Sequence, residues 1–308
     1  MIASYFSGRL GNQMFRYAFI RALWEERGGK DELVFNFRRV MAGRGSNFDD
    51  NLQHFSTLPY RTDNRSLVLH YGSAAQKWRY ASYRLCEKVA SVFPMKWDVL
   101  LLFQRQLLDK GILILESGDN DKQLRLPAID KVFVNGFFEN RAFFDHIRPI
   151  LLKEFQPRHA ALDANSSLYD AIAQCESVCV TVRRGDYLSS ALRNGFYVCD
   201  ESYFHRAIET MKKKIRNPLF VFFSDDIAWV RSHLSVPEGS LFERGDDPVW
   251  EKMRLMSACK HFIISNSSFS WWAQYLGQYE HKVVVSPTRW FNDPTWTSCL
   301  VDDSYVKV

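Results

Sequence analysis

The pattern of apolar and polar positions is most regular in the second half of the chain. Apolar runs rich in β-branched and aromatic residues at 178–182, 219–223, 261–264 and 282–285 predict strands that are buried on both faces. Segments 160–173, 201–214, 247–258 and 269–276 have the apolar spacing of helices and alternate with these strands. This alternation predicts a parallel sheet covered by helices.

The first half starts in the same way and then becomes less regular. Residues 2–6 predict a strand, 7–11 a glycine-containing turn, 12–27 a helix and 33–37 a second strand. After a polar loop at 41–51, we predict a helix at 76–92, a charged turn at 117–123, a strand at 132–134 and a helix at 140–155. Because regular alternation resumes at residue 160, we place a domain boundary near Gln156 and Pro157. The predicted fold is α/β, with Rossmann-like domains at residues 1–156 and 157–308 that face a central cleft.

Polar clusters follow three of the predicted strands in the second half. They are Arg183, Arg184 and Asp186; Asp225 and Asp226; and Asn266, Ser267 and Ser268. In a parallel sheet, all three clusters fall at the edge where ligands bind. Asp, Ser and Asn at such positions also cap helices, so each cluster alone has a structural explanation. The arginine pair makes the combination more specific, because two guanidinium groups suit a phosphate ligand.

The three clusters have complementary chemistry. Arg183 and Arg184 could neutralise a diphosphate, and Ser267 and Ser268 stand where a helix N-terminus could hold another phosphate oxygen. The Asp225–Asp226 pair could accept hydrogen bonds from a purine or a ribose. Asp186 has two open roles, which are an ion pair that orients an arginine and a part in catalysis.

The glycine-containing turn between the first strand and the first helix is a second candidate. Gly8 and Gly11 would let the backbone approach a ligand closely, although a tight turn needs glycine for its own sake. The turn does not match the dinucleotide fingerprint, and Asn36 replaces the acidic residue expected at the next strand end. The sequence also lacks the phosphate-binding loop of P-loop NTPases.

Charge and composition narrow the function classes. A net charge of +5 suits an anionic ligand or a membrane surface and does not favour nucleic acid. The 6 cysteines have no zinc spacing, and neither a signal peptide nor a membrane span is evident, so we expect a cytoplasmic protein. Asp119 and Asp121 could hold a metal on a diphosphate, but their Gly- and Asn-rich surroundings favour a solvated turn.

Four ordered segments resemble the motifs of the bacterial α-1,2-fucosyltransferases of glycosyltransferase family 11. They are residues 8–18, 182–187, 222–229 and 265–272, and the second contains the Arg-Arg-Gly-Asp-Tyr core of one family motif. The resemblance spans most of the chain. It implies a GT-B architecture and inverting transfer of fucose from GDP-fucose to O2 of a terminal β-galactoside, in bacterial glycan or O-antigen synthesis. It also implies no divalent metal and no cofactor besides the donor substrate.

The resemblance also assigns roles to residues. The second domain would bind the nucleotide, with Arg183 at the β-phosphate and with Ser267, Ser268 and the adjacent Asn266 and Phe269 supporting the diphosphate. Asn12, beside Gly11, would be the donor contact of the first, acceptor-side domain. The implied partners are GDP-fucose and a galactose-terminated oligosaccharide; a lipid-linked acceptor would allow peripheral membrane association, and the last segment could pack back on the first domain.

The sequence departs from the family pattern at two positions. Thr181 stands where the family has histidine, and Arg16 stands where it usually has glutamine. Because threonine cannot supply an imidazole, Asp186 becomes the candidate general base, and a mechanism driven mainly by leaving-group stabilisation is the alternative.

Two other functions remain open at this point. A glycosyltransferase with a different nucleotide sugar or linkage is the nearer one. A non-catalytic glycan-binding protein would fit the aromatic content of 15%, but it would have no diphosphate for the paired arginines to hold.

Overall fold

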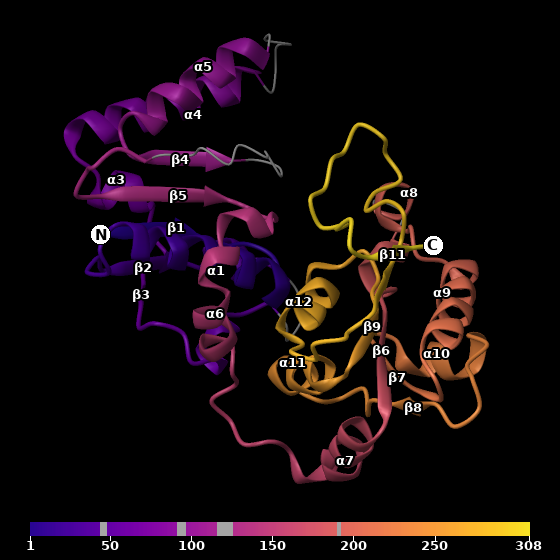
Figure 1. Cartoon of the computed structure of the whole chain (residues 1–308). Helices are drawn as coiled ribbons and strands as arrows, with labels where there is room; N and C mark the ends of the chain where they lie inside the picture. The colour runs from indigo at the N-terminus through magenta and orange to yellow at the C-terminus, as the bar shows by residue number, and fades with distance from the viewer. Residues whose placement is uncertain (44–47, 91–96, 116–125, 190–191) are drawn as a thin grey trace. The chain divides into compact units, whose positions relative to one another are not determined.

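The computed structural model describes residues 1–43, 48–90, 97–115, 126–189 and 192–308 (Figure 1). Contacts divide the chain into two compact units. The first unit comprises Met1–Asp50 and Thr57–Arg148, and the second comprises Asn51–Ser56 and Pro149–Val308. The chain thus passes from one unit to the other between Arg148 and Pro149, ahead of the predicted boundary at 156–157. Each unit is an α/β fold with its own parallel sheet, as the alternation of apolar segments predicts.

The second unit contains a six-stranded parallel sheet. Its strands are β6 (Glu176–Val182), β7 (Pro218–Ser224), β8 (Leu241–Phe242), β9 (His261–Ile263), β10 (Val284–Ser286) and β11 (Val306–Lys307), in the order β11-β10-β9-β6-β7-β8. The chain therefore adds β7 and β8 on one side of β6 and β9 to β11 on the other (Figure 1). This reversal places a topological switch point, where α/β sheets bind ligands, between β6 and β9.

The helices of this unit follow the predicted alternation. They are α7 (Ser166–Gln174), α8 (Arg193–Phe196), α9 (Glu201–Lys214), α10 (Ile227–His233), α11 (Val249–Ala258) and α12 (Ser268–Leu276). The apolar face of α9 packs on the central strands, with Tyr203 and Met211 against Val180 and Phe222. This packing makes β6 a rigid support for the residues that follow it.

The first unit contains a five-stranded parallel sheet. Its strands are β1 (Ile2–Tyr5), β2 (Leu33–Asn36), β3 (Arg61–Thr62), β4 (Ile112–Leu115) and β5 (Val132–Gly136), in the order β3-β2-β1-β5-β4. Its helices are α1 (Leu10–Glu26), α2 (Arg38–Met41), α3 (Leu67–Tyr71), α4 (Ala74–Ala90) and α5 (Trp97–Leu108). The strand order reverses between β1 and β5, so this sheet also has a switch point.

The prediction of one helix over residues 140–155 is wrong for its first half. Two 3₁₀ turns, Arg141–Phe143 and Asp145–Ile147, precede a short helix, α6 (Arg148–Glu154). The Asn140 side chain accepts a hydrogen bond from the Ala142 N–H at 2.9 Å, which starts a tight turn. Pro149 has no N–H to donate to a preceding turn, so the α-helix begins beside it. The predicted charged turn at 117–123 lies outside the described residues.

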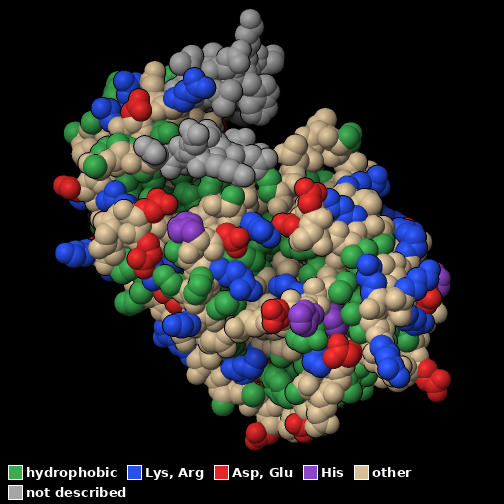
Figure 2. Space-filling view, in the orientation of Figure 1, with side chains coloured by type: hydrophobic (Ala, Val, Ile, Leu, Met, Phe, Trp, Pro, Cys, Tyr) green, Lys and Arg blue, Asp and Glu red, His purple; other side chains and the backbone are tan. Residues whose placement is uncertain are grey.

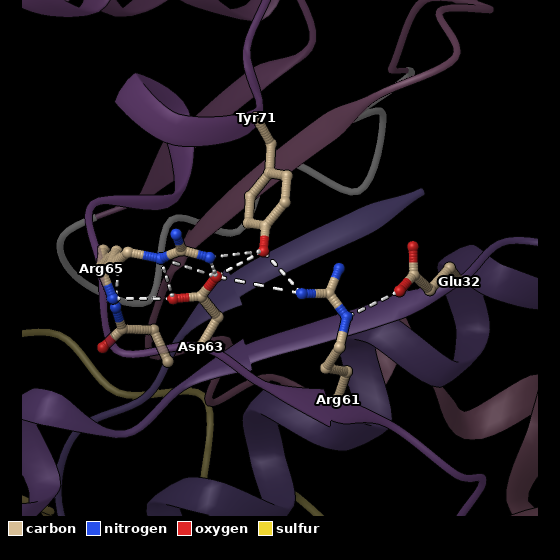
Figure 3. Close-up of polar contacts among 6 residues, drawn as sticks. Glu32, Arg61, Asp63, Arg65 and Tyr71 are labelled. Atoms are coloured by element: carbon tan, nitrogen blue, oxygen red, sulfur yellow. Dashed lines mark hydrogen bonds and ion pairs between the residues drawn. The ribbon is translucent and has the colours of Figure 1, made fainter.

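A polar network closes the loop that follows β3 (Figure 3). Asp63 is 8% exposed and accepts hydrogen bonds from Arg65, at 2.7 Å to Nη2, and from the Tyr71 hydroxyl. Arg61 donates to the same Tyr71 hydroxyl at 2.6 Å and to Glu32 at 2.9 Å. The hydrogen bonds from Arg65 and Tyr71 hold the pKa of Asp63 well below its usual range.

This network also fixes the end of β2. Asn36 donates from its side chain to the Arg65 carbonyl at 2.6 Å, and the Asn64 side chain accepts the Phe37 N–H at 2.9 Å. The loop after β3 thereby sets the direction in which the chain leaves β2 and enters α2. In the sequence, Asn36 was notable only because it stands where a dinucleotide-binding site has an acidic residue. The structure shows that its side chain braces the loop after β3.

We predict that Asp63→Asn lowers the melting temperature by roughly 3–8 °C, because an amide turns two donors toward Arg65 and Tyr71 and weakens the network. Differential scanning calorimetry at neutral pH measures the change. Asp303→Asn is the matched control, since Asp303 is fully exposed and pairs with Lys307 at 2.7 Å. Equal melting temperatures for the two variants would show that the network does not brace the loop.

Candidate functional site

The carboxyl ends of β6, β7 and β9 meet at the switch point of the second unit. Val182 of β6 lies opposite Ser224 of β7, and Val180 lies opposite Ile263 of β9. The three polar clusters named from the sequence therefore follow neighbouring strands and lie at one sheet edge. The first two clusters contact each other directly through ion pairs and a hydrogen bond, and the Asn266 carbonyl accepts a hydrogen bond from Tyr187, the residue after Asp186, at 3.0 Å.

Asp225 connects the end of β7 to the arginine pair after β6. Its Oδ1 accepts the Arg184 N–H at 2.9 Å, and its Oδ2 pairs with Nη1 of Arg183 at 2.6 Å. A β-carbon at Gly185 would collide with Asp225 Oδ2, so a larger residue here would push the carboxylate away from Arg183. One carboxylate thus orients both the backbone and a side chain of the arginine motif.

Arg183 is held by two carboxylates. Besides Asp225, it donates to Oδ1 of Asp186, and its guanidinium lies 5.4 Å from the centre of the Tyr187 ring. The side chain is 16% exposed, so part of the guanidinium still reaches the surface. Of the two roles left open for Asp186, the ion pair with Arg183 is therefore present.

Arg184 is held mainly by an aromatic ring. Its guanidinium carbon lies 3.3 Å from the centre of the Trp229 ring, and the side chain is 13% exposed. Its Nε is buried and has no hydrogen-bond partner among the described residues, and Asp226 Oδ2 lies 3.5 Å away. Stacking fixes the plane of the guanidinium while leaving its N–H groups less committed than those of Arg183. Sequence reasoning missed Trp229; the available signal was its position three residues after a capping aspartate.

Asp226 begins the helix that carries Trp229. Its Oδ1 accepts the Trp229 N–H at 3.2 Å, and its own N–H donates to Ser224 Oγ at 3.0 Å. Helix capping, the structural alternative for this cluster, is therefore present for Asp226. Beneath it, the fully buried Glu243 accepts the Ser224 N–H at 3.0 Å and pairs with Lys252 at 2.8 Å. Burial raises the pKa of Glu243, which the sequence did not single out.

Thr181 connects β6 to the loop after β9. Its hydroxyl donates to the Ile263 carbonyl at 3.3 Å and accepts the Ser265 N–H at 3.1 Å. Asn266 is fixed in turn, since its side chain donates to the carbonyls of Phe196, at 2.8 Å, and Trp290, at 2.9 Å. The asparagine named as a donor-binding residue thus organises the loop from its buried position.

The braced loop leads directly into α12. Ser267 stands at the N-cap and makes no side-chain capping hydrogen bond, and both Ser267 and Ser268 are half-buried, as is Phe269. The first backbone N–H groups of a helix have no partners within it and carry a partial positive charge. The helix start can therefore accept an anion beside the arginine pair.

Gly8, Gly11 and Asn12 lie in the first unit, at the carboxyl end of β1. Gly8 has φ +77°, and a β-carbon there would come within 2.9 Å of the Asn12 side chain. Gln13 donates to the Gly8 carbonyl at 3.2 Å and to the Asp49 carbonyl at 2.9 Å, which closes the turn. Gly11 is buried and Asn12 half-buried in the first turn of α1, which begins at Leu10, slightly earlier than predicted.

Several other expectations concern metals, membranes and charge. Asp119 and Asp121 lie outside the described residues; elsewhere, in the part that the structure describes, no three His, Cys, Asp or Glu side chains gather as a metal site. No helix within the described ranges is long and apolar enough to cross a membrane. Figure 2 shows basic and acidic side chains interspersed on the face drawn, in keeping with the small net charge.

The chain is similar to known proteins along most of its length. Across its length the chain is similar to an α-1,2-colitosyltransferase of Escherichia coli, with 28% identity over 94% of this chain and 92% of the relative. It is 30% identical to the O-antigen biosynthesis glycosyltransferase WbnK of E. coli, over 98% of each chain. Its fold is similar to the crystal structure of NodZ α-1,6-fucosyltransferase soaked with GDP-fucose, with a TM-score of 0.51, 14% identity, and coverage of 89% of this chain and 91% of NodZ.

These similarities confirm the GT-B type of fold and an enzyme that transfers a sugar. The family model of glycosyl transferase family 11 matches residues 102–306, a range that contains β6, β7, β9 and every polar cluster at their ends. The chain therefore belongs to glycosyl transferase family 11.

Proposed function

We propose that this protein transfers L-fucose from GDP-fucose to O2 of a terminal β-galactoside, with inversion and without a divalent metal. The observation that carries the proposal is the anchored pair of Arg183 and Arg184 beside the start of α12, at the switch point of the second sheet. This arrangement offers guanidinium and backbone N–H donors for a diphosphate. The four sequence segments that resemble α-1,2-fucosyltransferases support fucose as the transferred sugar.

In the proposed reaction, O2 of galactose attacks C1 of fucose, and the bond between C1 and the β-phosphate oxygen breaks. Negative charge then grows on the departing GDP. Arg183 would contact the β-phosphate, and Arg184 and the N–H groups of Ser268 and Phe269 would hold the remaining diphosphate oxygens. Because these donors are already positioned, they stabilise the charge more in the transition state than in the ground state.

The hydroxyl proton of the acceptor must also leave. We propose Asp186 as its acceptor, because the ion pair with Arg183 holds this carboxylate beside the guanidinium assigned to the leaving group. Thr181 does not fill this role, since both functions of its hydroxyl are used in hydrogen bonds to the backbone. If leaving-group stabilisation dominates, Asp186 serves mainly to orient Arg183.

A colitosyl donor is a second candidate, favoured by the similarity to an α-1,2-colitosyltransferase. Colitose is fucose without its 3-hydroxyl group. A site that hydrogen-bonds this hydroxyl discriminates strongly against the deoxy sugar, whereas an apolar site does not. The similarity to WbnK supports a role in O-antigen synthesis, and a lipid-linked acceptor would bring the protein to a membrane surface.

The first prediction of the proposal is metal-independent transfer. With GDP-fucose and a panel of β-galactosides in excess EDTA, we expect a product whose NMR spectrum shows an α-1,2 linkage. GDP-colitose and other nucleotide sugars in parallel reactions identify the preferred donor. Activity that EDTA abolishes and Mn²⁺ restores would contradict the metal-independent part, and transfer from none of the donors would overturn the function.

Replacement of the motif arginine should remove transition-state stabilisation. We expect Arg183→Ala to lower kcat/KM by about 10²-fold or more, on the order of the loss of one preorganised charge-stabilising group. Arg206→Ala is the control, because Arg206 is exposed on α9 and donates to Ser202 at 3.0 Å. A correctly folded Arg183→Ala enzyme with near wild-type transfer would contradict the assignment.

Thr181 allows a test of the loop that presents α12. We predict that Thr181→Val lowers stability by about 1–3 kcal/mol, because it leaves the buried Ser265 N–H without a partner. We expect the KM for the donor to rise severalfold, since the start of α12 loses its brace. Thr181→Ser retains the hydroxyl and should behave nearly as the wild type in denaturant unfolding and in donor titrations. If the valine and serine variants match in both measurements, the hydroxyl does not brace the loop.

A further inference from the structure

The first unit contains a cavity at its own switch point, between the ends of β1 and β5. Ser7, after β1, and Phe137, after β5, line it together with the end of β4 and side chains from α1, α2 and α4. Its volume of about 310 Å³ is at the lower end of the range for small-molecule sites. The cavity thus occupies the part of the sheet where α/β proteins bind ligands.

Arg16 of α1 is the buried cation of this cavity. It is 2% exposed, donates to the Tyr5 carbonyl and to Ser7 Oγ, both at 2.6 Å, and lies 4.9 Å from the centre of the Phe137 ring. Its Nε is buried and has no hydrogen-bond partner among the described residues. Burial lowers the pKa of Arg16 to about 10, so it remains charged at neutral pH. A buried guanidinium with an unused donor favours a negatively charged ligand.

Two further arginines line the cavity. Arg84 of α4 is paired with Glu87 at 2.5 Å, so these two charges cancel. Arg39 of α2 is exposed and forms no ion pair within the described ranges, and its charge also lowers the pKa of Arg16. The cavity therefore has an excess of positive charge contributed by Arg16 and Arg39.

Glu139 is the carboxyl group whose charge acts most on Arg16, but it forms no ion pair with Arg16 in the described structure. Burial raises the pKa of Glu139 to about 7, which weakens its compensation of the Arg16 charge. The preceding Phe138 has φ +55° and stacks on Phe19 at 4.0 Å. This left-handed conformation is unfavourable for a bulky side chain and fixes the loop beside the cavity.

We propose that this cavity binds a sugar-borne oxyanion, a carboxylate or a phosphate, on the acceptor glycan. Arg16 and Arg39 would pair with the oxyanion, and the aromatic faces of Tyr80 and Phe137 would contact the sugar ring. This inference rests on the proposed function in one respect, which is that the bound sugar belongs to the acceptor of the transfer reaction. The inference gives Arg16 a ligand, at a position where the resembled family usually has an uncharged glutamine.

Binding without a donor tests the site directly. The probes are methyl β-D-glucuronide and galactose 6-phosphate, with methyl β-D-galactoside as the neutral comparison and inorganic phosphate as the sugar-free anion. We expect both acidic sugars to bind about tenfold or more tightly than the neutral sugar, as for one charge-assisted hydrogen bond. In ¹H–¹⁵N spectra of the wild-type protein, the Arg16 Nε–H signal should shift on their addition.

Substitutions on α1 separate the cavity from general charge effects. Arg16→Gln should abolish the preference for acidic sugars, and Arg16→Lys should retain part of it through its charge. Arg21→Gln is the matched control, because Arg21 lies on the same helix and pairs with Glu25 at 2.6 Å. We expect it to bind the probes as the wild type does. If Arg16→Gln does not fold, the shift of the Arg16 Nε–H signal in the wild-type protein on addition of the acidic sugars tests the proposal instead.

Several results would overturn the proposal. They are equal affinity for acidic and neutral sugars, an unshifted Arg16 signal, binding of inorganic phosphate as tight as that of galactose 6-phosphate, or displacement of the acidic sugars by GDP. The last result would assign the cavity to the donor. Failure of GDP-fucose transfer with intact acidic-sugar binding would instead overturn only the acceptor role, whereas transfer without this preference would leave the proposed function standing.

Discussion

The candidate site depends on the carboxylate of Asp225, which joins two neighbouring strand ends. Because β6 and β7 are parallel and in register, Asp225 reaches both the Arg184 N–H and the Arg183 guanidinium. Gly185 has no β-carbon and leaves room for the carboxylate in this position. An arginine pair on an exposed turn would have many rotamers, and the cost of ordering it would weaken ligand binding. Because Asp225 orders the arginine pair when the protein folds, this cost does not reduce the affinity for the ligand.

The sequence was sufficient to predict the sheet edge and insufficient to predict how its residues are used. Buried parallel strands leave a strong apolar signal, so the convergence of Arg183, Asp225 and Asn266 could be inferred from strand ends alone. The capping role of Asp226 is local and was among the alternatives read from the sequence, whereas the stacking of Trp229 on Arg184 depends on how helix α10 packs beside the end of strand β6. The helix error over 140–155 has a different, local origin, because a side-chain hydrogen bond from Asn140 outweighed apolar periodicity.

Thr181 acts as a structural brace within the arginine motif. Its hydroxyl binds the Ile263 carbonyl and the Ser265 N–H, so the position connects β6 to the loop that presents α12. A group with both hydrogen-bonding functions used in backbone contacts is suited to bracing rather than to proton transfer. The proposed reaction consequently needs a proton acceptor elsewhere, and Asp186 is the carboxylate that contacts Arg183 from the same turn.

The two switch points differ in how their arginines are compensated. In the second unit, Arg183 already has two carboxylate partners, whereas the Arg184 guanidinium is held mainly by the Trp229 ring. In the first unit, Arg16 has only neutral hydrogen-bond acceptors, and Arg39 has no ion-pair partner among the described residues. An oxyanion entering that cavity would not have to break an ion pair of Arg16 or Arg39 among the described residues. Its charge would therefore be compensated directly, and the same buried guanidinium would disfavour a neutral sugar that offers only hydroxyl groups.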